Sequence, residues 1–429
     1  MKIPKLIKGP KGLNVLLIDN PNSLFTSMLI LVGVGSDWEN KKNNGIFHFI
    51  EHLYFKGTKN YPTPKILMEA IDNLGGVYNA FTSFEYTGYY LKVLPEYIFE
   101  GLEILTDIIL SPLFLEEEIE KERKVVIEEI NLYQDNPVHL VFDIGNRLTF
   151  GDQPAGWSIL GTKETVSSLK RGDILKTVKS YYSSKNTLIV ISGRIYNSKK
   201  IIKFIFEKFK EYNSVSPKEK PKFKKPKNEY KFKVLNKDVE QAHIFLGFPL
   251  DGLKQIKDKK FIYSLLSAVL GEKSSSRLWL KVREEMGAAY YIRSNFLDYS
   301  DRSLFFIQAG VAIERLTEVL NEIVKELVVL KKEGVNKKEI EISKAVLKSN
   351  LFLDLEESLG IAIFYARQYL SEKKLLTPKE IEKKINSLES KSLEKELKSL
   401  FLYPHLKFAV ILPQKNNFDF SKIFKQLVK

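Results

Sequence analysis

The chain has 429 residues, more than one typical hydrophobic core serves, so two domains of roughly 200 residues each are expected. It contains no cysteine, which excludes disulfides and thiolate metal sites and leaves histidine and carboxylate as the available metal ligands. The net charge of +14 would suit a nucleic-acid partner, but the lysines are scattered with glutamate along expected helix faces, and a solvated surface explains them better.

Nothing in the sequence predicts a membrane span or an export signal. No run approaches the ~18 uninterrupted apolar residues that a helix needs to cross a bilayer. The first ten residues also lack the apolar core of a secretory signal. We therefore expect a soluble cytoplasmic protein with no membrane partner and no nucleic-acid partner.

The first expected elements are two buried strands, at residues 15–19 and 27–32. The intervening Asn-Pro-Asn at 20–22 is typical of a turn, so the two strands are predicted to pair with each other. A helix over residues 45–55 is expected soon after the second strand.

This helix carries the motif His48-x-x-Glu51-His52. At ~3.6 residues per turn the two histidines lie about 40° apart around the axis, with Glu51 between them in height. Neutral imidazoles at i and i+4 can ligate one zinc ion, and an unligated carboxylate beside them can take a proton from water. Paired surface histidines without a metal would give the same short match, so the rest of the chain must distinguish the two interpretations.

The elements that follow are helices and strands in mixed order. We expect a helix from Pro64 to Asn73, stopped by Gly75-Gly76, and then a hairpin or edge strand over residues 77–93, which are rich in Tyr, Phe and Thr. Later expected elements are a helix from Pro95 to about Ser111, a long charged helix over 116–135, a strand over 187–193 and a helix over 198–212.

The long charged helix is the expected source of a third ligand, because a hydrolytic zinc site takes three protein ligands plus water. Its candidates are Glu122, Glu128 and Glu129. Glu122 and Glu129 are two turns apart and share one helix face, whereas Glu128 points elsewhere. Spacing alone does not choose the ligand among them.

Residues 214–228 are rich in lysine and proline and are expected to form an extended, charged linker. The predicted domains are therefore an N-terminal domain, residues 1–213, and a C-terminal domain, residues 229–429. The second domain is predicted to repeat the first.

The repeat aligns residues 261–271 with residues 47–57. In this register, His48, Glu51 and His52 correspond to Ile262, Leu265 and Leu266, and Glu129 corresponds to Asn350. The second copy thus keeps the apolar pattern and has lost every candidate metal group. The scaffold does not require those groups.

Three segments of the first half together resemble one family. They are His48-x-x-Glu51-His52 with Phe55-Lys56-Gly57-Thr58, then Gly75-Gly76-x-x-Asn79-Ala80-Phe81-Thr82, then Glu122-Arg123-x-Val125-Val126-Ile127-Glu128-Glu129-Ile130. The combination closely resembles the pitrilysin/insulinase family of zinc peptidases with the inverted His-x-x-Glu-His motif, and within it the processing-peptidase branch. The resemblance runs nearly end to end.

The resemblance implies roles for these residues. His48, His52 and Glu129 would ligate one Zn²⁺ per chain, because Glu129 lies 77 positions after His52, the separation that the family uses. Glu51 would be the general base. Glu122 would be a carboxylate that orients a ligating histidine.

Two further segments would bind the substrate. Residues 276–290 look like the family segment whose arginine and tyrosine contact the scissile peptide, and the match falls on Arg283 and Tyr290. A guanidinium can fix a carbonyl, and a phenol can donate to a developing oxyanion. The strand Asn79-Ala80-Phe81-Thr82 would pair with an extended peptide through main-chain hydrogen bonds.

The expected fold class is α+β, with two homologous domains that each contain a mainly antiparallel sheet flanked by helices. The family resemblance implies that a chain of this length forms half of a clamshell. The expected function is a zinc endopeptidase that cleaves short or unfolded peptides in a closed chamber. A homodimer whose sites are completed in trans by Arg283 and Tyr290 is expected, and a heterodimer with a homologue is the alternative.

Two other functions are compatible with parts of the sequence. The first is a non-catalytic structural or partner subunit of a peptidase heterodimer, which the complete set of metal residues argues against. The second is a basic nucleic-acid-binding protein, which the dispersed lysines argue against.

Overall fold

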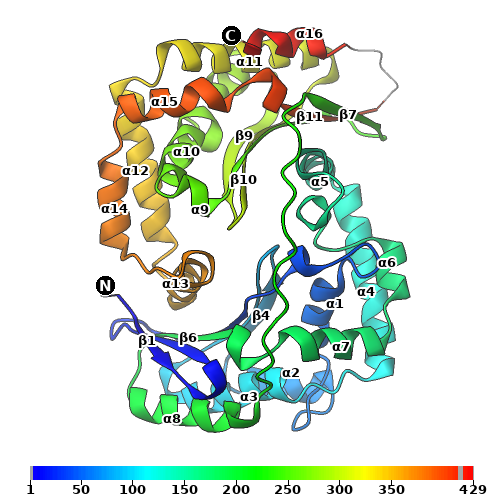
Figure 1. Ribbon diagram of the computed structural model, residues 1–429, viewed down its shortest axis with the longest axis vertical. Helices are drawn as coiled ribbons and strands as arrows, with labels where there is room; N and C mark the ends of the chain where they lie inside the picture. Colours follow the sequence, from blue (N-terminus) through cyan, green and yellow to red (C-terminus); the bar gives the residue numbers. More distant parts are fainter. Residues whose placement is uncertain (1–2, 414–418, 429) are drawn as a thin grey trace. The chain divides into compact units, whose positions relative to one another are not determined.

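The computed structural model describes residues 3–413 and 419–428 and divides into two units (Figure 1). The first unit contains a mixed sheet of six strands in the order β1-β2-β6-β3-β5-β4. Only the β2–β6 pair is parallel. The strands are β1 (Lys5–Lys8), β2 (Asn14–Asp19), β3 (Thr26–Val32), β4 (Val77–Thr82), β5 (Thr87–Val93) and β6 (Thr187–Gly193).

The predicted pairing of the first two long strands is wrong. β2 and β3 do not touch as a hairpin, because β6 lies between them and pairs with both. Every residue of β3 and of β6 is buried, so the apolar runs fit central strands. The predicted hairpin over residues 77–93 is present as β4 and β5, with β4 at the sheet edge.

Seven helices of the first half accompany this sheet. They are α1 (Ile46–Leu53), α2 (Pro64–Asp72), α3 (Ile98–Leu110), α4 (Glu116–Asp135), α6 (Lys163–Ser168), α7 (Arg171–Tyr181) and α8 (Ser198–Lys208). The helix predicted to reach residue 212 ends as α8 at Lys208 and continues only as a 3₁₀ turn. The helix predicted from Pro95 begins as a 3₁₀ turn over Pro95–Tyr97 and is α-helical, as α3, only from Ile98. The other predicted helices agree to within about two residues, the usual uncertainty of helix ends.

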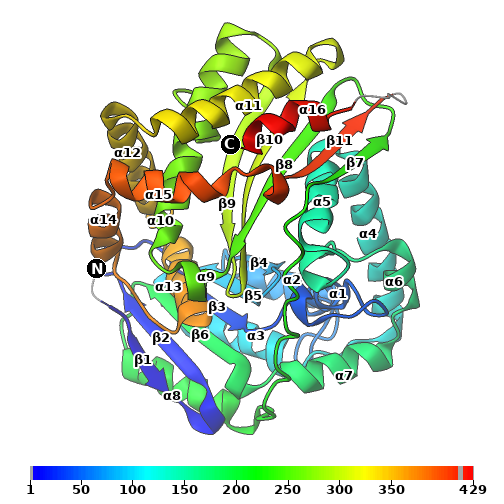
Figure 2. The same ribbon diagram turned by 45° about the horizontal axis from the view of Figure 1, so that its top comes forward.

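The second unit contains a five-stranded sheet in the order β7-β11-β8-β10-β9, formed by β7 (Lys231–Asn236), β8 (Ala242–Asp251), β9 (Ala289–Asp298), β10 (Arg302–Val311) and β11 (Lys407–Leu412) (Figure 2). Its helices are α5 (Pro137–Phe150), α9 (Leu253–Ile256), α10 (Lys259–Ser267), α11 (Leu316–Glu333), α12 (Lys337–Leu353), α14 (Pro378–Asn386), α15 (Ser390–Leu400) and α16 (Ser421–Phe424). The β7–β11 pair is parallel and the other pairs are antiparallel. Apart from β1, this is the topology of the first sheet, so the predicted repeat and the α+β fold are confirmed.

The two units are not continuous stretches of chain. The first comprises the described residues up to Asn131, then Ser158–Lys222 and Leu353–Thr377, and the second comprises the remainder. Each half of the sequence therefore contributes one helix to the other unit: α13 (Ser358–Glu372) packs on β3 and β6, and α5 packs on β8 and β11. The predicted domains, residues 1–213 and 229–429, are continuous stretches, and the sequence did not predict that α5 and α13 belong to the other unit.

Small and apolar residues make both exchanged helices fit. In α13 the buried face contains Ile361, Ala362 and Ala366, and the Ser358 hydroxyl lies 2.8 Å from that of Ser27 on β3. In α5, Gly145 lies against Phe245 of β8, where an added Cβ would come within 2.2 Å of the ring. Across the described residues, no helix combines the length and apolar character needed to cross a membrane.

Candidate metal centre

Helix α1 positions the His48-x-x-Glu51-His52 motif. It begins after Gly45, whose φ of +93° favours glycine. The carboxylate of Glu39 accepts hydrogen bonds from the backbone N–H groups of Gly45 (2.8 Å) and Phe47 (3.1 Å) and from the Asn44 amide (2.8 Å). These bonds satisfy donors at the start of the helix. Burial raises the pKa of Glu39 to about 8, and the hydrogen bonds from Gly45, Asn44 and Phe47 oppose that rise only in part.

The two faces of α1 have different surroundings. Its apolar residues, Ile46, Phe47, Phe49, Ile50 and Leu53, belong to the main core of the first unit. The motif residues lie on the remaining face, where His48 and Glu51 are 7% and 9% exposed and His52 is partly exposed. The core therefore fixes the helix while the motif faces away from it.

Three donor atoms converge from α1 and α4. The Nε2 atoms of His48 and His52 lie 3.3 Å apart, and Oε2 of Glu129 lies 3.5 Å from the first and 3.3 Å from the second. These side chains form a group that could hold a metal ion. The structure thus brings together the ligands that the resemblance implied, from two helices separated by more than 60 residues of sequence.

The spacing fits a metal ligated by this donor set. Ligand atoms about 2.0–2.1 Å from a tetrahedral centre are roughly 3.4 Å from one another. The three measured separations, 3.3 to 3.5 Å, match that value. Two nitrogens and one carboxylate oxygen are also the donor set of many catalytic zinc sites. The residues present therefore fit zinc.

Glu122 contacts His52 from the side away from the three donor atoms, through Nδ1 rather than Nε2. Its Oε1 accepts a hydrogen bond of 2.8 Å from Nδ1 of His52, and its Oε2 lies 2.6 Å from the ammonium of Lys56. Such a carboxylate fixes the tautomer and orientation of a ligating histidine. Glu128, the third candidate from spacing, is exposed and accepts from Asn131, so it is outside the group.

The electrostatics of the metal-free residues separate the two histidines. Burial, with the neighbouring His52, lowers the pKa of His48 to about 4. Burial also opposes charging of His52, but hydrogen bonds to Glu122 and Glu129 outweigh it and raise that pKa to about 9. Hydrogen bonding to His52 lowers the pKa of Glu129. A cation is thus favoured where His52 and the two carboxylates meet.

Glu51 differs from the other acidic groups of the site. Burial raises its pKa, against the hydrogen bond that the Thr82 hydroxyl donates to its Oε2. Thr82 is the last residue of the edge strand β4, which also contains Asn79, Ala80 and Phe81. The strand expected to bind substrate is therefore tied directly to the expected general base.

Arg283 and Tyr290 lie in the second unit, where the structure brings them together. The Arg283 guanidinium donates to the backbone oxygen of Tyr290 and lies 4.2 Å from the centre of the Trp279 ring. The Tyr290 side chain is 74% exposed. A phenol this exposed is available to contact another molecule.

The second copy shows what replaced the donor group. Ile262, Leu265 and Leu266 on α10 are buried in the core of the second unit. Asn350 on α12, the counterpart of Glu129, donates to Glu272. A neutral amide and one carboxylate satisfy each other there, so no cation is required.

The sequence analysis missed three supporting groups. Lys56 follows His52 by four residues, and this i+4 spacing was an available signal for its approach to Glu122. Glu39 and the Thr82–Glu51 bond gave no sequence signal, because loop and strand contacts of this kind have no fixed spacing.

Comparison with known proteins assigns the chain to a family. Residues 14–163 match the family described as Insulinase (Peptidase family M16), and residues 168–347 match the Peptidase M16 inactive domain. The chain belongs to peptidase family M16, as the sequence resemblance predicted.

Curated relatives cover nearly the same length. A Bacillus subtilis protein named an uncharacterized zinc protease is 35% identical over 387 residues, 90% of this chain and 91% of the relative. A Rickettsia bellii protein with a similar name is 34% identical over 375 residues, 87% of this chain and 89% of the relative. The family-level assignment is therefore to zinc peptidases.

Solved structures agree with the fold. The crystal structure of a Helicobacter pylori protease has a TM-score of 0.88 and 26% identity, and the match covers 96% of this chain and all (100%) of that one. A Pseudomonas fluorescens peptidase M16 inactive domain has a TM-score of 0.87 at 13% identity, with 97% and 99% covered, and supports the fold alone.

Proposed function

We propose that this protein is a zinc endopeptidase that cleaves short or unfolded peptides. The observation that carries the proposal is the donor triangle of His48, His52 and Glu129, with separations of 3.3 to 3.5 Å. Glu51, a buried carboxylate outside that triangle, adds the proton acceptor that peptide hydrolysis requires. One Zn²⁺ per chain fits this donor set.

The ligated metal would lower the pKa of a water molecule and polarise the scissile carbonyl. Glu51 accepts the proton of the attacking water and returns it to the leaving amine. Its raised pKa suits both directions of transfer, since the carboxylate must gain and lose a proton in each cycle. The Thr82 hydroxyl donates to Oε2 of Glu51, and Oε1 would accept the proton of the water.

The substrate backbone would be held by the edge strand β4. Residues 79–82 pair with β5 on one side only, so the other edge can accept an extended peptide. Main-chain pairing of this kind gives affinity with little demand on side chains. We therefore expect broad specificity, limited by the requirement for an extended chain.

The test is cleavage of a mixed peptide library by the purified protein, read by mass spectrometry, with and without a chelator. Internal cleavage that stops on chelation and returns with added zinc is the expected result. No cleavage by protein that contains stoichiometric zinc would overturn the proposal. It would favour the rival role, a structural or partner subunit of a peptidase heterodimer.

The active assembly is proposed to be a homodimer that encloses a chamber, with Arg283 and Tyr290 acting across to the partner's site. The guanidinium would fix a substrate carbonyl and the phenol would donate to the developing oxyanion. The exposure of Tyr290 supports this, because an intermolecular role needs an accessible hydroxyl.

Mixing two inactive variants tests the trans arrangement. In a Glu51→Gln and Tyr290→Phe mixture, exchanged dimers contain one site with both native residues, so activity should return to about a quarter of the wild-type value if chains pair at random. Activity that stays absent although labelled subunits exchange would contradict completion in trans and leave the zinc-site proposal intact.

A further inference from the structure

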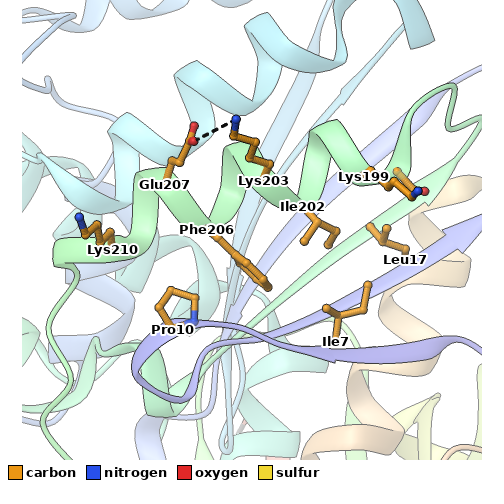
Figure 3. A pocket seen from close by; sticks show the side chains of 10 residues that line it. Ile7, Pro10, Leu17, Lys199, Ile202, Lys203, Phe206, Glu207 and Lys210 are labelled. Carbon is orange, nitrogen blue, oxygen red and sulfur yellow. Dashed lines mark ion pairs between the residues drawn. The ribbon is translucent and has the colours of Figure 1, made fainter.

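The first unit contains a groove that shares no residue with the metal centre. It lies between α8 and the β1–β2 edge of the sheet and has a volume of about 680 Å³ (Figure 3). Its wall consists of Ile7, Pro10, Leu17, Ile202, Phe206 and a row of polar residues from α8 and the turn that follows it.

The floor of the groove is apolar. Ile202 and Phe206 extend from α8 toward Ile7 and Pro10, and Leu17 closes one end (Figure 3). Ile7, Leu17, Ile202 and Phe206 are only partly buried while packing against the main core. Partly exposed apolar side chains gathered in one depression are unusual on a soluble surface and commonly mark an interaction site.

The rim of the groove is positively charged. Lys199 and Lys210 lie toward opposite ends, and Lys203 lies between them (Figure 3). Glu207 is the single acidic residue of the wall, and its ion pair with Lys203 is long, at 3.8 Å. Lys5, across the β1–β2 ladder from Leu17, is also exposed. The rim therefore presents a net positive charge around an apolar strip.

We propose that this groove binds an acidic amphipathic helix of a protein partner. The groove follows α8 and the 3₁₀ turn after it from Lys199 to Lys210, which at ~1.5 Å per residue is about 16 Å, or three helical turns. Apolar residues of the partner at i, i+3/i+4 and i+7 would pack on Ile202 and Phe206. Acidic residues near both of its ends would pair with Lys199 and Lys210.

The shape favours a helix over a lipid. Ile202 and Phe206 are partly buried while Lys199 and Lys210 are exposed, whereas a protein that docks on a bilayer projects its apolar side chains outward. A single acyl chain would require enclosure over most of its surface, and this groove is open along one side. A peptide helix leaves its own polar face in water and so needs no enclosure.

The test uses the full-length protein and a labelled synthetic peptide of about four helical turns, with leucines at i, i+3/i+4 and i+7 and glutamates elsewhere. Fluorescence anisotropy should show saturable binding that a scrambled peptide of the same composition lacks. The double variant Lys199→Glu with Lys210→Glu should bind the peptide at least about tenfold more weakly than the wild type at low salt. The difference in affinity between the two proteins should be smaller at high salt. Ile202→Glu should weaken binding similarly at both salt concentrations.

The matched control is Lys65→Glu with Ile66→Glu on α2, where Ile66 is 43% exposed. This pair should leave binding unchanged, and thermal unfolding should show that all variants are folded. Absence of saturable binding, or equal binding of the scrambled peptide, would overturn the proposal. Binding of anionic vesicles or oleate that the groove variants weaken, without peptide binding, would also overturn it and would indicate a lipid. A dimer that Ile202→Glu dissociates would overturn it too and would indicate a second copy of the chain.

Discussion

Glu51 is buried and interacts electrostatically with His52 and Glu129, but it is not one of the three converging donors. Its partner is the Thr82 hydroxyl, and burial keeps its pKa above the usual range. A group placed in this way can transfer protons without holding the metal. The separation of these two roles is open to direct measurement.

Glu51→Gln should lower peptide hydrolysis by at least ~10²-fold, the usual contribution of a general base. Zinc content should stay near that of the wild type, because the amide removes the proton acceptor and no ligand. Turnover of a fluorogenic peptide and metal analysis of the same sample check both. Loss of zinc in this variant would mean that Glu51 is itself a ligand.

Substitution of the three ligand candidates on α4, Glu122, Glu128 and Glu129, should change zinc affinity to different extents. Glu129→Gln should lose the metal most completely, and Glu122→Gln should weaken binding by about 10–100-fold, as loss of a histidine-orienting carboxylate does. Glu128→Gln, exposed on the same helix, is the matched control and should bind zinc normally. Competition with a chromogenic chelator measures all three, and equal losses in Glu122→Gln and Glu128→Gln would refute the orienting role.

At the scale of elements, α1 depends on a residue outside it. Glu39 satisfies two backbone donors at the helix start and the Asn44 amide from a fully buried position. Glu39→Ala should leave these donors without acceptors and cost about 2–3 kcal/mol of unfolding free energy. Zinc affinity should fall with it, since α1 carries two ligand candidates.

Thr63→Ala is the comparison for this prediction. Thr63 caps α2 with an exposed hydrogen bond from Ile66 N–H at 3.3 Å, so its loss should cost only about 1 kcal/mol. Urea unfolding of both variants measures the difference. If Glu39→Ala cost no more than Thr63→Ala, the buried carboxylate would not be the main stabiliser of the α1 start.

His243 lies on β8, far in sequence from the candidate metal ligands, and is expected to make the free energy of unfolding depend on pH. Burial lowers its pKa, and Nδ1 lies 3.1 Å from the Tyr291 hydroxyl, with Arg293 near that ring. The unfolded chain therefore binds the proton more readily, and stability is lost as pH falls below the ordinary histidine value of about 6.5 and through the lowered pKa. Above that value the contribution is fully present.

His243→Gln should keep a hydrogen bond to Tyr291 and remove the titration. The variant should lose less unfolding free energy than the wild type between neutral and mildly acidic pH, measured by urea unfolding at several pH values. His139 is exposed, so His139→Gln is the control variant. Parallel pH profiles for wild type and His243→Gln would show that this histidine does not contribute.

At the scale of the whole molecule, the exchange of α5 and α13 makes each unit depend on both halves of the sequence. Without α13, the apolar faces of β3 and β6 lose the helix that covers them. A fragment ending at Lys222 should therefore unfold without cooperativity and bind hydrophobic dyes. Joining residues 353–377 to it through a flexible linker, with residues 132–157 replaced by a second linker, should restore a cooperative urea transition.

This prediction contrasts with the domain boundaries inferred from the sequence. A fragment ending at Lys222 that unfolded as cooperatively as the joined form would support two sequential domains. The physical reason to expect otherwise is the fully buried β3 and β6, whose apolar residues need cover on both faces.

Much of the fold could be predicted from local patterns. Most helix bounds, the β4–β5 hairpin and the repeat followed from apolar periodicity and glycine positions, which act within a few residues. The end of α8 and the start of α3 did not. The pairing of β2 with β3 could not, because a buried strand has no local mark of its neighbour. Here β6, more than 150 residues later, takes the place between them.

The sequence by itself determined the family, the motif on α1 and the absence of metal groups in the second copy, because each depends on residue type and spacing along one element. Only the tertiary structure decided that Glu129 approaches the histidines while Glu128 does not, that Lys56 and Thr82 hold Glu122 and Glu51, and that α5 and α13 exchange units. These contacts join elements that are distant in sequence, and packing of the whole core sets their positions.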